Sequence, residues 1–340
     1  MMSKVKVGVA GFGVIGQRLA DGAARQEDME LVGVADVAPT LAVRALAESG
    51  MPYQMFAAAP GAADALTGAG ISVSGDFEDL LAEVDIMLDS TPGGIGAKNK
   101  EIYVQHGVKA IFQGGEKGSI ADVFFHGYAN YEKGLGQNYL KLTSCNTTGL
   151  IRTVDCLDRA FGVEKTAITI IRRVADPGDT HRGLVDSLMV EPIPNHQAVD
   201  LMNIMPHIDA TGLLIHAPVT HGHIITIVAT PKKKTTPDEV IEAFRAHPRI
   251  RVVRIADGFN TNTSLFNYAR FLGHTRGDMY EVGLFEEMVG MSGDDIMFAI
   301  NIPQESVVIP ETMDGIRASL RMQEDRLEAV GMTNKYLGMA

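Results

Sequence analysis

The chain has 340 residues, of which 46% are hydrophobic and 21% are charged, and its formal net charge at pH 7 is -12. This composition is that of a globular protein, and at roughly 100–200 residues per domain the length favours two domains. An acidic surface repels phosphate backbones and anionic lipid, so neither nucleic acid nor a membrane is an expected partner. Two cysteines cannot cross-link so long a chain, and no secretory signal or spanning segment is visible, so we expect a cytoplasmic protein.

Short apolar runs alternate with helical patterns over residues 1–143. The expected strands cover 4–10, 30–35, 71–74, 85–89 and 109–112. The expected helices cover 16–25, 41–48, 77–82 and 96–105, and the Ala- and Gly-rich segment 57–70 suits a short surface helix. This alternation is typical of βαβ units, so we predict an α/β domain built on a parallel sheet.

The first expected strand is followed by a G-x-G-x-x-G turn, GFGVIG at 11–16, which opens a helix. Such a turn lets backbone approach a pyrophosphate, and the helix N-terminus supplies N–H donors. Asp36 ends the next strand, where a carboxylate accepts hydrogen bonds from ribose hydroxyls and repels a 2′-phosphate. A structural glycine turn beside a solvated aspartate is the plainer alternative. The context favours a dinucleotide site that prefers NAD and admits NADP.

Two further glycine-rich turns, at 91–94 and 113–116, follow later strands of the same domain. In a doubly wound sheet, ligands bind at the carboxyl ends of the strands, where these turns lie. They could be ordinary turns, but three such loops at one edge predict close approach of backbone to one cofactor.

A candidate nucleophile follows in the segment LTSCNTTGL at 142–150, which leaves a strand and enters a helix. Cys145 stands at the helix N-terminus, where the macrodipole lowers a thiol pKa and favours the thiolate that attacks carbonyl carbon. Cys156 falls in the middle of the same helix and resembles a small buried hydrophobic residue. A buried structural role is the alternative for Cys145, but its polar neighbours favour the nucleophile.

Positive and donor groups gather within a short span of this acidic chain: Arg172, Arg173, His181, Arg182 and His196. Arginine binds phosphate through two parallel N–H donors, which lysine does not reproduce. A solvated charged face is the alternative, and we expect anion binding here.

Two histidines, His221 and His223, flank Gly222 at the start of an apolar strand at 224–228. Residues two apart on a strand share a face, so both rings are expected to point into one pocket. Near neutral pH a histidine is the natural general base. A metal-binding pair and a structural pair are the alternatives. Because no third ligand is evident nearby, we expect no metal.

These motifs, in this order, resemble those of the archaeal-type (type II) phosphorylating glyceraldehyde-3-phosphate dehydrogenases. The resemblance extends over almost the whole chain. Its motifs are GFGVIG at 11–16, FQGGEK at 112–117, SCNTTG at 144–149, RRVADP at 172–177, PNH at 194–196, PQES at 303–306, IPE at 309–311 and TNKYLG at 333–338.

The resemblance implies an N-terminal Rossmann dinucleotide-binding domain at 1–143 and an α+β catalytic domain with a mixed sheet at 144–305. A C-terminal helical segment at 306–340 is expected to pack back on the Rossmann domain, and the family is usually tetrameric. The implied reaction is phosphorylating oxidation of D-glyceraldehyde 3-phosphate to 1,3-bisphosphoglycerate with NAD(P), in glycolysis or gluconeogenesis. Its two anions, substrate phosphate and inorganic phosphate, each need a pocket.

The resemblance also implies a role for individual residues, with Cys145 as the nucleophile and His221, the first of the histidine pair, as the base. The expected substrate-binding residues are Ser144, Asn146, Arg182, His196 and Gln197. The expected cofactor-binding residues are Gly11, Gly13, Val14, Ile15, Gly16, Asp36, Gly115, Arg173 and Gln304. The family usually has a second histidine where this chain has Gln197, which carries no charge toward a phosphate. It often has lysine where this chain has Asp36, a departure that supports NAD.

Two other functions remain open at this point. Because of Gln197, a related phosphorylating dehydrogenase of erythrose 4-phosphate or aspartate semialdehyde is the runner-up. A non-catalytic NAD-sensing module belongs to another class of function, and the presence of Cys145 and His221 argues against it.

Overall fold

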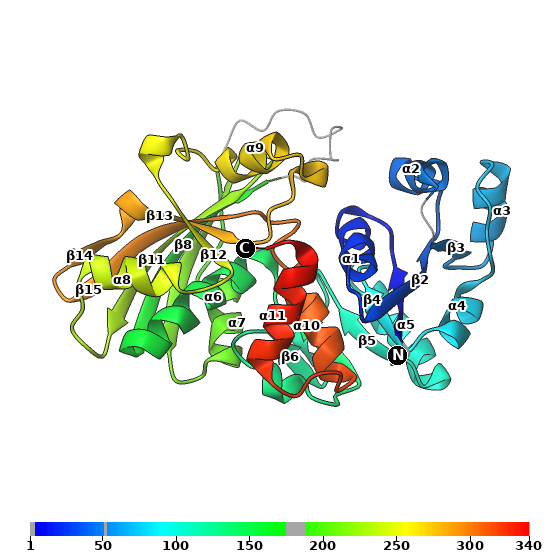
Figure 1. The fold of residues 1–340 in the computed structure, drawn as a ribbon, viewed down its shortest axis with the longest axis horizontal. Helices are drawn as coiled ribbons and strands as arrows, with labels where there is room; N and C mark the ends of the chain where they lie inside the picture. The colour runs from blue at the N-terminus through cyan, green and yellow to red at the C-terminus, as the bar shows by residue number, and fades with distance from the viewer. Residues whose placement is uncertain (1–3, 51–52, 175–187, 340) are drawn as a thin grey trace. The chain divides into compact units, whose positions relative to one another are not determined.

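The chain divides into two compact units, which Figure 1 colours from blue at the N-terminus to red at the C-terminus. The computed structural model describes residues 4–50, 53–174 and 188–339. The first unit comprises Met1–Leu142 and Ile309–Gly338, and the second consists mainly of Thr143–Val308. These limits lie close to the boundaries expected at 143 and 305.

The first unit is built on a seven-stranded sheet in the order β3-β2-β1-β4-β5-β7-β6, and every pair is parallel. Its strands are β1 (Val5–Ala10), β2 (Met29–Asp36), β3 (Gln54–Ala57), β4 (Ile86–Asp89), β5 (Lys109–Phe112), β6 (Val123–Phe125) and β7 (Tyr139–Leu142). The central strands are fully buried at Val7, Val9, Ile86 and Leu88. The strand order reverses between β1 and β4, which makes their carboxyl ends the expected ligand edge. The predicted Rossmann-type fold is confirmed.

The helices of this unit connect its strands close to the predicted positions. They are α1 (Val14–Ala24), α2 (Leu41–Ser49), α3 (Ala62–Gly68), α4 (Phe77–Glu83) and α5 (Ile95–His106). At the start of α4, the side chains of Asp76 and Asp79 each accept a backbone N–H from the other residue. This reciprocal capping fixes where the helix begins.

The strand predicted at 71–74 is wrong, because the third strand of the chain is β3, at Gln54–Ala57. The segment runs beside β3 and makes single contacts with it: Ser74 N–H donates to the Met55 carbonyl, and Ala57 N–H donates to the Gly75 carbonyl. Only one isolated bridge, between Ala57 and Asp76, forms there. A regular ladder does not develop, and β3 closes the edge of the sheet instead.

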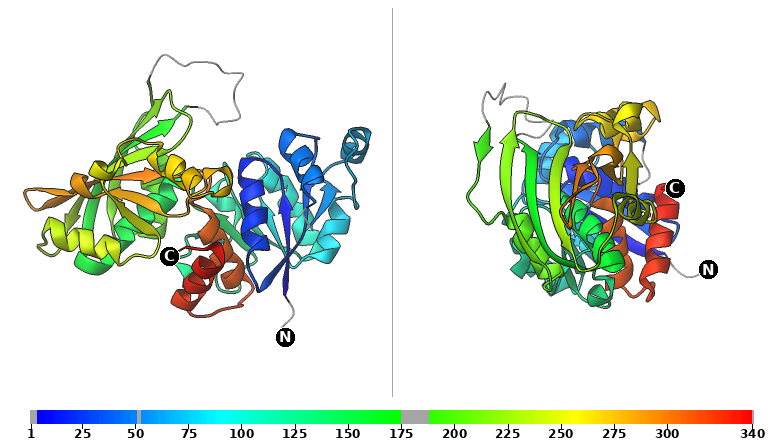
Figure 2. Two further views of the ribbon diagram at one scale, coloured as in Figure 1. Left: turned by 45° about the horizontal axis from the view of Figure 1, so that its top comes forward. Right: turned by 90° about the vertical axis from the view of Figure 1, so that its left-hand side faces the viewer.

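The C-terminal segment returns to the first unit as two helices, α10 (Ile309–Ser319) and α11 (Arg326–Leu337), which lie side by side in Figures 1 and 2. The fully buried Arg317 guanidinium ties α10 to the chain between α1 and β2, where it donates to both carboxylate oxygens of Asp28. The helical segment expected at 306–340 thus forms two helices, and Arg321, at φ 51, lies between them.

The second unit is built on an eight-stranded mixed sheet in the order β12-β13-β15-β11-β8-β10-β9, with β14 paired to β15. Its strands are β8 (Val163–Arg173), β9 (Met189–Val190), β10 (Asp209–Ala217), β11 (His223–Pro231), β12 (Ile250–Val253), β13 (Val282–Phe285), β14 (Gly290–Ser292) and β15 (Asp295–Ile302). Its helices are α6 (Cys145–Phe161), α7 (His196–Ile204), α8 (Pro237–Arg245) and α9 (Ser264–Phe271). Buried residues alternate along β11 and β10, and α6 and α7 contact these strands. One face of the sheet is therefore covered by helices.

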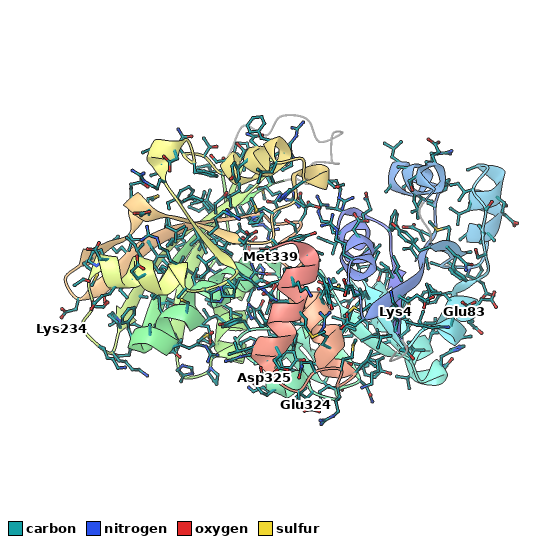
Figure 3. All side chains as sticks on the ribbon, in the orientation of Figure 1. Lys4, Glu83, Lys234, Glu324, Asp325 and Met339 are labelled. Carbon is teal, nitrogen blue, oxygen red and sulfur yellow. The ribbon has the colours of Figure 1, made fainter. Side chains whose placement is uncertain are left out.

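Short 3-10 helices complete the described connections. They are Gly118–Ile120, Tyr131–Gly134, Ile255–Asp257, Thr275–Gly277 and Glu286–Met288. The basic run 232–234 is an exposed loop after β11, and Figure 3 shows Lys234 at the periphery of its unit. Within the described ranges, no helix combines the length and the apolar character needed to cross a membrane.

Candidate active site

In the glycine turn after β1, the backbone requires glycine at Gly11 and Gly16 but not at Gly13. Gly11 has φ 81, and a Cβ on Gly16 would lie 1.8 Å from the Gly11 carbonyl oxygen. A Cβ on the exposed Gly13 would meet nothing within 4 Å. Gly13 is the N-cap of α1, and no side chain caps the N–H groups of Val14 and Ile15 in that first turn. The turn therefore presents open backbone donors, as a bound diphosphate requires.

Asp36 ends β2 and contacts the same turn. Its Oδ2 accepts the Phe12 N–H at 2.7 Å, and its Oδ1 accepts the N–H groups of Val37 (2.7 Å) and Ala38 (3.3 Å). The carboxylate thus helps to fix the glycine turn. Because two carboxylate oxygens offer about four acceptor positions, Asp36 still has capacity for a ribose hydroxyl.

The three glycine-rich loops of the first unit meet at one edge of its sheet, as predicted. Ser90 Oγ donates to the Gly11 carbonyl at 2.8 Å, and Glu116 Oε1 accepts the N–H groups of Gly94 (2.6 Å) and Gly96 (3.0 Å). A Cβ on Gly93 would come within 3.4 Å of the Gly115 carbonyl oxygen. The open turn, the carboxylate and the adjoining backbone together fit a dinucleotide.

Cys145 is the first residue of α6 in the second unit. Ser144 is the N-cap, and its Oγ accepts the Thr147 N–H at 3.4 Å. The Cys145 side chain is half-buried, and both it and Cys156 are free thiols. Cys156 donates to the Ala243 carbonyl, and burial raises its pKa to about 12, in keeping with the structural role predicted for it.

The electrostatics of Cys145 differ from the sequence-based expectation of a lowered pKa. Burial raises the pKa of the Cys145 thiol, and the Glu305 carboxylate adds to that effect. Arg172, Arg173 and the backbone N–H of Asn146 act in the opposite direction without overcoming burial. The expectation failed because a helix N-terminus is visible in a sequence, whereas the depth of burial is not.

His223 is almost fully buried, at 1% exposure, and its Nδ1–H donates to Oδ1 of Asn146 at 2.7 Å. Burial holds the pKa of His223 well below its usual range, and Arg173 and Arg172 lower it further. The ring is therefore neutral at pH 7. The side-chain oxygen of Asn146, which was expected to bind substrate, therefore accepts a hydrogen bond from this histidine.

His221 does not share a strand face with His223, because β11 begins only at His223. Gly222 between them has φ 72, and a Cβ there would lie 1.8 Å from the Asn262 carbonyl oxygen. The half-buried His221 ring stacks on Phe266 with centroids 4.3 Å apart, and its Nδ1 is hydrogen-bonded to Thr220 Oγ1 at 2.8 Å. The two rings thus occupy different surroundings, and His221 lines a small pocket with Phe266.

Two expected cofactor residues, Arg173 and Gln304, are 131 positions apart in the sequence yet share one carboxylate. Arg173 Nη1 donates to Glu305 Oε1 at 2.5 Å, and Gln304 Nε2 donates to the same oxygen at 3.1 Å. Gln304 Oε1 accepts the Gly222 N–H at 2.7 Å, which connects this group to the histidine loop. Sequence reasoning missed Glu305, although it follows Gln304 directly.

The expected substrate residues of α7 lie at its N-terminus, where Asn195 caps the helix. His196 is exposed, and the buried Gln197 donates from Nε2 to His196 Nε2 at 2.7 Å. Thr147 Oγ1 donates to Asp200 Oδ2 at 3.3 Å, so the first turns of α6 and α7 adjoin. Arg182, the remaining expected substrate residue, lies outside the described residues. In the part of the chain that is described, no group of three or more His, Cys, Asp or Glu residues could hold a metal ion.

Comparison with known proteins gives consistent results. Residues 144–266 match the family model described as the C-terminal domain of glyceraldehyde 3-phosphate dehydrogenase. The chain is 39% identical to the glyceraldehyde-3-phosphate dehydrogenase of Thermococcus sibiricus, over 99% of both chains. It is 36% identical to that of Methanococcoides burtonii, over 99% of this chain and 100% of the relative. Among solved structures, aspartate semialdehyde dehydrogenase II from Vibrio cholerae has the same fold, with a TM-score of 0.67 at 14% identity, covering 94% of this chain and 99% of the other.

Proposed function

The chain belongs to the glyceraldehyde-3-phosphate dehydrogenase family, and on that premise we propose that Cys145 and His221 are its nucleophile and its general base. It is an oxidoreductase that uses NAD(P), and its substrates are glyceraldehyde 3-phosphate and inorganic phosphate. The observation that best supports the proposed roles is the position of Cys145 at the start of α6, within electrostatic reach of Arg172 and Arg173. These two cations attract an anionic aldehyde to the nucleophile of an otherwise acidic protein.

In the proposed mechanism, Cys145 Sγ forms a bond to the aldehyde carbon and gives a hemithioacetal, whose hydroxyl proton passes to His221. The N–H of Asn146 stabilises negative charge beside the sulfur. The chemistry that NAD(P) supplies when bound is acceptance of a hydride. After oxidation, Cys145 carries a thioester. An oxygen of inorganic phosphate then bonds to the acyl carbon, the C–S bond breaks, and the electron pair returns to Sγ.

We assign the cofactor to the glycine turn at 11–16, with Gly11, Gly13, Val14, Ile15 and Gly16, and to the adjoining Asp36 and Gly115. Arg173 and Gln304, which belong to the second unit, remain proposed cofactor residues. Ser144, Asn146, His196, Gln197 and Arg182 remain the proposed substrate residues.

The function is tested by following nicotinamide absorbance with D-glyceraldehyde 3-phosphate and NAD, with and without inorganic phosphate. We expect sustained turnover only when phosphate is present, and a single burst when it is absent, because the thioester then accumulates on Cys145. Erythrose 4-phosphate and aspartate semialdehyde serve as comparison substrates. If either one is turned over faster than D-glyceraldehyde 3-phosphate, the substrate must be reassigned. A turnover rate that does not depend on inorganic phosphate would contradict phosphorylating chemistry.

Cofactor preference depends on Asp36, whose carboxylate repels a 2′-phosphate. We predict that Asp36→Lys shifts the ratio of kcat/KM for NAD over NADP toward NADP by on the order of 10-fold or more, because a repelling charge becomes an attracting one. Asp36→Asn is the matched control. It removes the repulsion without adding a cation, so its shift should be smaller. Steady-state kinetics with both cofactors measures the ratio, and unchanged selectivity in Asp36→Lys would refute the NAD preference.

The sheet of the second unit has an open face that supports the expected homotetramer. Ile171, Leu213 and Met297 point to the side opposite the helices and are 36%, 51% and 43% exposed. Three strands of this sheet, β15, β8 and β10, thus present apolar side chains that a second copy of the chain would cover. Free thiols at Cys145 and Cys156 suit the proposed reducing cytoplasm.

A further inference from the structure

The backbone around Gly222, between the two histidines, is held by amide side chains and not by the ladder of the sheet. β11 begins at His223, so the carbonyl of His221 and the N–H of Gly222 lie outside the regular strand. Asn262 Nδ2 donates to the His221 carbonyl at 2.6 Å, and Gln304 Oε1 accepts the Gly222 N–H at 2.7 Å. Backbone groups need hydrogen-bond partners when they are removed from water, and here side chains supply them.

Asn301 on β15 connects these backbone groups to the segment that carries Asn262. Its Nδ2 donates at 3.0 Å to the carbonyl of His223 and at 3.0 Å to the carbonyl of Asn262. The Asn301 side chain is 1% exposed and stands in a strand between the buried apolar residues Ile300 and Ile302. Burying an amide is unfavourable unless it is hydrogen-bonded, so the two bonds give a physical reason for a polar residue at this position.

The backbone makes a close approach at this point. Gly222 has φ 72, and a Cβ there would lie 1.8 Å from the Asn262 carbonyl oxygen and 3.1 Å from Asn301 Nδ2. Only glycine leaves room for both amides and also adopts this left-handed conformation readily. The segment before β11 and the segment before α9 therefore meet without an intervening side chain.

The His221 ring is held from the same part of the chain as its backbone. Phe266, in the first turn of α9, stacks on this ring with centroids 4.3 Å apart. Leu265 beside it belongs to one hydrophobic cluster with Ala299, which lies two residues before Asn301 on β15. Residues two apart on a strand share a face, so Asn301 lies on the face of the sheet that carries this cluster. The start of α9 thus fixes both parts of His221.

We propose that Asn262 and Asn301 are positioning residues for the general base. Asn262 fixes the carbonyl of His221, and Asn301 fixes the carbonyls on both sides of that contact, at His223 and Asn262. This role rests on the function proposed above, in which His221 accepts the hydroxyl proton of the hemithioacetal. A base must lie within hydrogen-bond reach of the proton that it takes, and a misplacement of about 1 Å can cost on the order of 100-fold in rate. Loss of either amide should therefore slow the chemical step.

The test is a double-mutant cycle on the phosphate-free burst. Asn301→Leu and Asn262→Ala are each made in wild type and in His221→Asn. In wild type, each should slow the burst by about 10- to 100-fold. In His221→Asn, each should slow it further by no more than about 2-fold, because the group that they position is absent. A residue that only supported the fold would slow the burst by the same factor in both backgrounds.

Thr230→Val is the matched control. Thr230 Oγ1 donates to Asp295 Oδ1 at 2.6 Å, so it joins the same two strands, β11 and β15, at the end of their ladder away from His223. This variant should keep the wild-type burst rate. Thermal unfolding and titration with NAD report whether each variant is folded and binds the cofactor. If Asn301→Leu does not fold, Asn262→Ala decides the question, because Asn262 is only half-buried.

Two results would show that these residues do not position the base. One is a wild-type burst rate in both Asn301→Leu and Asn262→Ala, and the other is an equal slowing with and without His221. An unchanged burst in His221→Asn would overturn the assignment of the base, and the positioning role with it. Absence of a burst in wild type is a separate outcome, which would refute the proposed function itself.

Discussion

Cys145→Ser is expected to reduce turnover on the order of 10³-fold or more, because a serine hydroxyl stays protonated and cannot replace the thiolate as nucleophile. Stopped-flow absorbance should show no burst of reduced nicotinamide with glyceraldehyde 3-phosphate. The proposed cofactor residues of the glycine turn lie in the other unit, so titration of the variant with NAD should still show binding. Full activity in this variant would remove Cys145 from the mechanism.

The chain contains its own control for this experiment. Cys156 belongs to the same helix, but it is buried and donates to the Ala243 carbonyl. Cys156→Ser should retain the burst.

Iodoacetamide should alkylate Cys145 and spare Cys156. The rate of alkylation of Cys145 should keep rising with pH above about 8.5, the usual thiol pKa. The alkylation rate should rise over this range because burial raises the pKa of Cys145, so that the reactive thiolate forms only at higher pH. An alkylation rate that no longer changes with pH above pH 7 would contradict a raised pKa of Cys145.

Local sequence signals were sufficient for the elements that define the cofactor edge. The turn at 11–16 carries glycines at positions where a side chain would clash, and the apolar run before it has no alternative to a strand, so both could be predicted. The edge strand β3 was missed because Gln54–Ala57 is short, and the run at 71–74 looked equally strand-like. Which of two short segments pairs with β2 is decided by tertiary contacts, not by local pattern.

The candidate site was predictable in its residue types and less so in its geometry. The motif identified Cys145 and the histidine pair, but the rule that residues two apart share a face failed at Gly222, where the left-handed backbone turns His221 away from the strand. The sharing of Glu305 by Arg173 and Gln304 depends on contacts between distant positions. Such contacts leave no periodic signal in one sequence.

His221→Asn is expected to slow the phosphate-free burst on the order of 10²–10⁴-fold, the usual contribution of a positioned general base. Two observations favour His221 over His223 as that base. Its ring is half-buried and can exchange its proton with solvent, while Thr220 and Phe266 fix its orientation. His223 is 1% exposed, and its Nδ1–H is committed to Asn146. We therefore propose His223 as a positioning residue that holds Asn146 beside Cys145.

The two histidines are separated by how much each substitution slows the burst. His223→Asn should slow the burst less than His221→Asn, because it removes a hydrogen bond to Asn146 and leaves the proposed base in place. Burial already holds the pKa of His223 well below its usual range, so its own titration should not appear near neutrality. If His223→Asn slows the burst by the larger factor and His221→Asn leaves the burst rate nearly unchanged, the base is His223, and the role proposed here for His221 is wrong.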